Sequence, residues 1–198
     1  MTESQREPVP RADGSELEIA LAFLRFARHC VLKKADGLDE EQLRRSVVPS
    51  GTSLLGLVQH LTDGERYWFG HHVAGDPDAA DVDFSMTVHA GRGVAEVFEA
   101  YRAAAAASDE ILTAVGHLDA RVREPVDGQH LSVRWVVAHM SAETARHAGH
   151  ADILREQLDG SVGTGADDAA AARFDDAFWA AHRAEVERAA RAADVAGG

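Results

Sequence analysis

The sequence has few of the residues on which several classes of protein depend. A single cysteine, Cys30, excludes an internal disulfide framework and any zinc site built from several cysteines. Lysine and arginine number 20 against 33 aspartates and glutamates, which gives a net charge of −13. Such an acidic surface repels the phosphates of nucleic acids and of anionic lipids. We therefore expect neither a nucleic acid nor a membrane surface as a partner.

Long hydrophobic runs are also missing from the sequence. The longest uncharged apolar stretches fall well short of the ~20 residues that cross a bilayer. The first residues, MTESQREPVPRADGSE, lack the basic-then-apolar order of a signal peptide. Because 45% of the residues are hydrophobic and 27% are charged, the composition is typical of a soluble globular chain. We therefore expect a cytoplasmic protein.

Apolar residues recur at helical spacing in four long segments. Helix-capping residues and breakers predict helices from Ser15 onward, from Thr52 or Ser53 to Gly75, from about Gly93 to Val115 and from Ser132 to Gly160. Polar connections separate them, and the first of these, at 37–51, has room for one short helical turn. The pattern predicts an all-α fold, an up-down four-helix bundle with an additional C-terminal helix.

The chain divides into three predicted parts. Residues 1–14 form a flexible N-terminal lead, residues 15–160 form the bundle, and residues 161–198 form a linker followed by a helix at roughly 169–193. The last helix has a thin apolar side, so we expect it to pack on the outside of the bundle or on a second subunit. A homodimer is one assembly that this side allows.

Histidine is the unusual count, at 11. His139, Glu143 and His147 recur every four residues, so they share one face of the predicted fourth helix. They cannot all bind one ion, because the rise from His139 to His147 is ~12 Å, whereas ligand bonds are ~2.0–2.2 Å long. At most one adjacent pair can chelate, and further ligands must come from another helix.

His60 on the predicted second helix offers the missing ligand. It lies between Gly56 and Gly64, each one turn away, and glycine inside a helix costs about 1 kcal/mol relative to alanine. The two glycines indicate either room needed beside His60 or close packing around a core histidine. Together with Glu143 and His147, His60 makes a three-ligand site that leaves a position open for water or substrate. Imidazole and carboxylate ligands suit Zn²⁺ first, with Ni²⁺, Fe²⁺ or Mn²⁺ as alternatives.

Two blocks of the sequence resemble a known family. SLLGLVQHLTDGERYWFG and SVRWVVAHMSAETARHAGHADILREQLDG resemble the DinB-like superfamily of metal-binding four-helix bundles, in particular an actinobacterial branch related to mycothiol-dependent S-transferases. The resemblance spans roughly residues 15–160. Members carry one histidine on the second helix and an H-x-x-x-H or E-x-x-x-H pair on the fourth. By that match the ligands are again His60, Glu143 and His147.

The resemblance implies a divalent-metal-dependent thiol S-transferase, in which a metal-bound thiolate attacks an electrophile. The partners would be a small electrophile and a low-molecular-weight thiol such as mycothiol, oriented by His139, His150 and Arg146. Three alternatives stay open: a mycothiol-dependent isomerase, a metal-dependent hydrolase, and a non-catalytic stress-response bundle that binds a metal or small ligand. The isomerase relative has an extra C-terminal domain, where this chain has only a linker and a helix.

Overall fold

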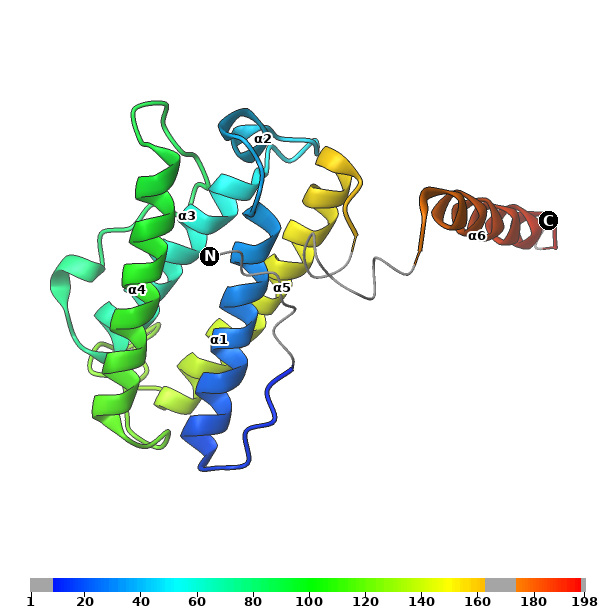
Figure 1. The fold of residues 1–198 in the computed structure, drawn as a ribbon. Coiled ribbons are helices and arrows are strands. Elements are labelled where there is room, and N and C mark those ends of the chain that lie inside the picture. The colour runs from blue at the N-terminus through cyan, green and yellow to red at the C-terminus, as the bar shows by residue number, and fades with distance from the viewer. Residues whose placement is uncertain (1–8, 163–173, 197–198) are drawn as a thin grey trace.

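The computed structural model describes residues 9–162 and 174–196, and the regular structure in these ranges is helical (Figure 1). The elements are α1 (Glu16–Ala35), α2 (Glu40–Arg44), α3 (Leu54–Glu65), η1 (Arg66–Val73), η2 (Pro77–Ala79), α4 (Val94–Val115), α5 (Val133–Asp159) and α6 (Asp176–Ala196). Over the described ranges, β pairing is limited to two isolated bridges, Arg121 with Ser132 and Val126 with Gln129. The all-α bundle with an additional C-terminal helix is thereby confirmed, whereas the three-part division of the chain stays a prediction.

The helix ends follow the local sequence. Ser15 caps α1 through a reciprocal capping box with Glu18, whose carboxylate accepts from the Ser15 backbone N–H at 2.7 Å. Ser53, one of the two expected candidates, caps α3, and Ser132 caps α5. At the other end of α5, Gly160 adopts the left-handed backbone that stops a helix.

The predicted second helix changes from an α-helix to a π-helix partway along its length. It is α-helical only to Glu65 and continues as the π-helix η1, in which the Ala74 N–H donates to the Phe69 carbonyl five residues back at 2.9 Å. Gly70 allows η2 to approach this wider turn, because a Cβ at Gly70 would lie 2.9 Å from the Cβ of Ala79. Apolar periodicity does not distinguish an α-helix from a π-helix, so the sequence did not reveal the change.

The connection between η1 and α4, residues 74–93, runs the length of the bundle, and we call it the crossover. One core cluster joins the end of α1, the starts of α3 and α4, and the second half of α5. The other joins the first half of α1, η1, the end of α4 and the start of α5. Therefore α1 and α5 run in one direction and α3 and α4 in the other. The predicted up-down order, in which successive helices alternate in direction, is therefore wrong for α3 and α4, because the long crossover returns the chain to the end of the bundle at which α3 began.

The C-terminal helix α6 lies apart from the bundle in Figure 1 and exposes Phe178 and Val186. It begins at Asp176, later than the predicted start. Residues 169–173 of the predicted helix lie outside the described residues. The packing of this helix on a second subunit stays a prediction.

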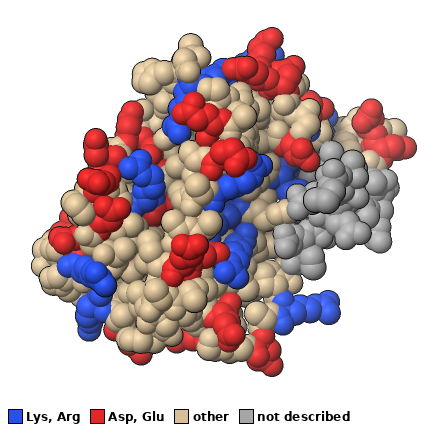
Figure 2. Space-filling view, turned by 60° about the vertical axis from the view of Figure 1, so that its left-hand side comes forward, with Lys and Arg blue, Asp and Glu red and all other residues tan. Residues whose placement is uncertain are grey.

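Charged side chains of both signs share one face of the molecule (Figure 2). On the face drawn in Figure 2, lysines and arginines lie among aspartates and glutamates. Several pair locally along one helix, as Arg102 does with Glu99 on α4 at 2.7 Å. None of the described helices combines the length and apolarity needed to cross a membrane.

A buried ion network joins α1, α3 and α4. The Arg28 guanidinium donates to both oxygens of Glu65, from Nε and Nη2, at 2.7 Å each, and from Nη1 to Asp109 at 2.7 Å. Both Arg28 and Glu65 are almost inaccessible to water. Burial acts to lower the pKa of Arg28, but the two carboxylates outweigh it and raise that pKa. Arg28 follows the buried Leu24 by one turn of α1, so its place on the apolar face is the signal from which a buried charge could have been predicted.

Gly56 allows the crossover to contact α3. A Cβ at Gly56 would lie 2.4 Å from the backbone carbonyl oxygen of Met86, and a Cβ at Gly64 would lie 3.3 Å from the methyl carbon of Met140. Of the two explanations for these glycines, close packing is therefore the one that the structure supports. The room is taken up by the crossover on one side and by α5 on the other.

Replacing Glu65 with leucine should destabilise the protein by about 3 kcal/mol, because Arg28 would stay buried with only Asp109 as a partner. The measurement is the free energy of unfolding in urea. Arg25→Ala is the control, since Arg25 is exposed and pairs with the same Asp109. It should cost less than about 1 kcal/mol, and an equal loss in both variants would contradict the role of the buried pair.

Gly56→Ala should destabilise the protein by about 1–3 kcal/mol, because the added methyl group meets backbone that cannot move without shifting the crossover. The matched variant is Gly149→Ala on α5, where nothing lies within 4 Å of the added Cβ. That variant should gain about 0.5–1 kcal/mol from helix propensity. Thermal unfolding of the two variants should therefore show shifts of opposite sign.

Candidate metal centre

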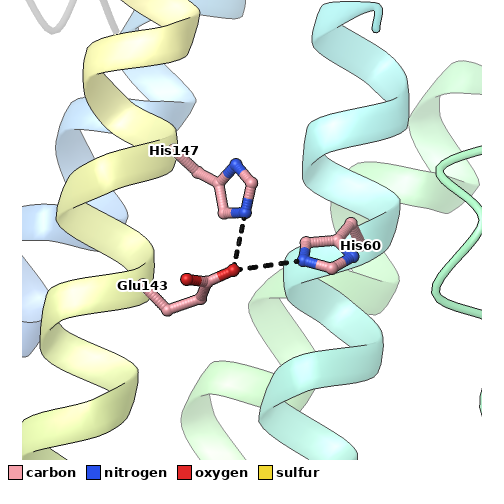
Figure 3. A group of neighbouring side chains, drawn as sticks. All are labelled: His60, Glu143 and His147. Carbon is pink, nitrogen blue, oxygen red and sulfur yellow. Dashed lines mark hydrogen bonds and ion pairs between the residues drawn. The ribbon is translucent and has the colours of Figure 1, made fainter. Parts of the chain in front are cut away.

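Three donor atoms from two helices converge between α3 and α5 (Figure 3). Nε2 of His147 lies 2.9 Å from Oε1 of Glu143, and Nε2 of His60 lies 3.6 Å from the same oxygen. All three donor atoms lie within 4.8 Å of one another. Tetrahedral ligands ~2.1 Å from one ion are ~3.4 Å apart. The widest separation must shorten by about 1.4 Å, which small side-chain rotations can supply, so the three residues fit a divalent cation.

The centre is closed on one side and open on the other. The His147 side chain is 3% exposed, whereas that of Glu143 is 29% exposed. Both residues lie on α5, one turn apart, and His60 faces them from α3. Water and small molecules can therefore reach the donor atoms from the Glu143 side.

The protonation states of the pair suit a cation. Burial acts to raise the pKa of Glu143, but hydrogen bonds with His147 and His60 and the charge of Arg146 outweigh it and lower that pKa. Burial lowers the pKa of His147, and its bond to Glu143 opposes this only in part. An ionised carboxylate beside a neutral imidazole is the combination that metal binding requires.

Two further side chains flank the candidate donors. Nδ1 of His150 lies 3.3 Å from Nδ1 of His147, and this hydrogen bond leaves Nε2 of His147 directed at the centre. Nη1 of Arg146 lies 3.8 Å from Oε2 of Glu143, and Arg146 is largely exposed. Nδ1 of His60 is buried and has no hydrogen-bond partner within the described part of the chain.

His139, the third residue of the four-residue repeat, is not one of the three converging donors. Its ring stacks on Trp135 with the centroids 5.1 Å apart and the planes at 5°, and it contacts Trp68 at 4.5 Å. The sequence allowed either His139 and Glu143 or Glu143 and His147 to chelate one ion. The structure brings the second pair together with His60.

Phe84 on the crossover is a neighbour of the centre that the sequence did not indicate. Its ring lies edge-on to His60, with the centroids 5.6 Å apart, and the side chain is 41% exposed. Val82, Phe84, Met86 and Val88 alternate with polar residues, a signal for extended chain with one buried side. That pattern does not say which helix the segment meets, so it did not place Phe84 near His60.

A comparison with models of protein families gives a match over most of the chain. The family model described as mycothiol-S-transferase matches residues 20–160, which include the three candidate donors and well over half of the chain. A search of curated proteins found no match.

The wild-type protein should bind about one Zn²⁺ per chain, and His147→Ala should weaken that binding more than the 10–100-fold that loss of an outer-shell partner causes. The measurement is calorimetric titration of the metal-depleted protein with Zn²⁺. His139→Ala is the matched control, because His139 lies on the same face of α5 but points at Trp135. A loss of affinity in His139→Ala as large as in His147→Ala would show that the donors are assigned wrongly.

Proposed function

The chain belongs to the mycothiol-S-transferase family, and from that we propose that it is a divalent-metal-dependent S-transferase with mycothiol as its thiol. The observation that carries the proposal is the convergence of His60, Glu143 and His147 on one point, beside the partly exposed side chain of Glu143. In the reaction, the thiol loses its proton to solvent and its sulfur forms a bond to the electrophilic atom. The bond to the leaving group breaks, and that group departs with the electron pair.

A divalent cation held by His60, Glu143 and His147 would supply positive charge that favours the thiolate over the thiol at neutral pH. Two neutral imidazoles and one carboxylate would leave one of the two positive charges uncompensated, so the donor set favours an anionic sulfur ligand. Zn²⁺ is the expected ion, and Ni²⁺, Fe²⁺ and Mn²⁺ are alternatives for the same donors.

The remaining polar residues orient the thiol. Arg146 is exposed beside Glu143 and presents a cation at the open side, where it would pair with a carboxylate on a substrate. His150 holds the ring of His147 in position through the bond between their Nδ1 atoms. These two residues therefore position the reactants, and neither exchanges a proton with the thiol in this proposal.

The experiment is turnover of mycothiol with a panel of electrophiles, measured by mass spectrometry of the conjugate. Metal-depleted protein should be inactive and regain activity with Zn²⁺, and His60→Ala should lower kcat/KM by at least about 100-fold, because the charge that stabilises the thiolate is lost. His117→Ala is the control, since His117 is exposed just after α4 and should leave turnover unchanged.

Other outcomes separate the alternative functions. Metal binding without turnover of any thiol would indicate a binding protein. Metal-dependent cleavage of an ester or amide without thiol would indicate a hydrolase. Conversion of a substrate to an isomer, with the thiol recovered unchanged, would indicate an isomerase.

A further inference from the structure

Aromatic rings gather on one side of the candidate metal centre. Phe84 lies edge-on both to His60 and to Tyr67, with ring centroids 5.6 Å apart in each case. The ring centroids of Tyr67 and Trp68 are 5.4 Å apart, and those of Trp68 and His139 are 4.5 Å apart. The crossover, η1 and α5 each contribute to this set. We call Phe84, Tyr67, Trp68 and His139 the aromatic wall.

The aromatic wall lies next to the candidate donors along both helices. His139 precedes Glu143 by one turn of α5, a rise of ~6 Å. Tyr67 follows His60 by about two turns along α3 and η1, and Phe84 bridges the two through its ring contacts. A small molecule on the wall would therefore lie beside the donor atoms.

Phe84 is held in place by its own loop. The Asp83 carboxylate accepts from the Ser85 N–H at 2.9 Å and from its hydroxyl at 3.0 Å. Two residues further, the Met86 carbonyl lies against Gly56. An exposed ring that is already positioned loses little conformational entropy when a ligand packs on it.

The two sides of the centre differ in chemistry. Toward the end of α5 lie the exposed Arg146 and His150, which suit the polar thiol. Toward η1 lies the aromatic wall, which suits an apolar molecule. A carbon atom that a thiolate attacks must be poor in electrons, and electron-poor rings pack well against the electron-rich faces of aromatic side chains.

We propose that the electrophile is a planar, electron-poor aromatic molecule that packs on the aromatic wall, with Phe84 as the specificity-determining residue. This proposal rests on the S-transferase function proposed above. With 1-chloro-2,4-dinitrobenzene as the probe, the thiolate sulfur forms a bond to the ring carbon that carries chlorine. The carbon–chlorine bond breaks, chloride leaves with the electron pair, and the thiol proton has gone to solvent.

The test compares Phe84→Leu with the wild type on two electrophiles. Leucine keeps an apolar side chain but removes the ring, so KM for 1-chloro-2,4-dinitrobenzene should rise about 3- to 10-fold. The kcat, the KM for mycothiol and the bound zinc should not change. KM for chloroacetamide, which has no ring, should also stay the same.

Phe23→Leu is the matched control for the loss of an exposed ring. Phe23 lies on α1, which carries none of the three donors, and it is 45% exposed, close to the value for Phe84. Phe23→Leu should leave all of these constants unchanged. Equal rises in KM for both electrophiles in Phe84→Leu, or no rise for either, would overturn the proposal.

A binding measurement separates this proposal from the proposed function. Calorimetric titration of the zinc-loaded protein with 1,3-dinitrobenzene, which has no leaving group, should show binding that is about 3- to 10-fold weaker in Phe84→Leu. If the wild type turns over no electrophile but this difference in binding remains, the S-transferase function fails and the aromatic binding surface is supported. If the wild type turns over electrophiles but Phe84→Leu binds 1,3-dinitrobenzene as tightly as the wild type does, the S-transferase function is supported. The binding of the electrophile on the aromatic wall is then contradicted.

Discussion

The position of α3 against α1 and α5 is the constraint on which the candidate metal centre depends. Two parallel bonds between the Arg28 guanidinium and the Glu65 carboxylate fix that position. This geometry tolerates little displacement, because both groups are planar and their bonds are directional. Glu65 lies five residues after His60 on the same helix, and α1 makes its most extensive packing with α5. The pair therefore controls where His60 lies opposite Glu143, without touching the centre.

The direction of the helices has a second consequence for the centre. Because α3 and α4 run parallel, the chain between them must return along the bundle, and the crossover does so against α3. Gly56 permits this contact, since any side chain there would meet the Met86 carbonyl. Phe84 reaches His60 as a result. One topological feature therefore brings an apolar ring from a polar segment to the edge of the centre.

The centre combines a closed interior with two different approaches. His147 is sealed from water, which keeps its imidazole neutral, while the partly exposed Glu143 leaves the donors accessible. Polar and cationic groups lie on one side and aromatic rings on the other. The proposed reaction joins a polar thiol to an apolar electrophile, and this asymmetry would let each reactant reach the same point from a surface of its own polarity.

The sequence by itself determined the helices and indicated the candidate donors His60, Glu143 and His147. Ser15 and Ser132 cap helices by bonding to residues close to them in the chain, and Glu143 and His147 are only four residues apart. Such short-range patterns can be recognised without knowledge of the fold. Only the tertiary structure decided that His60 faces Glu143, that His139 stacks on Trp135, and that Phe84 lies over His60. These contacts join residues on different elements, and no local pattern encodes the packing that brings them together.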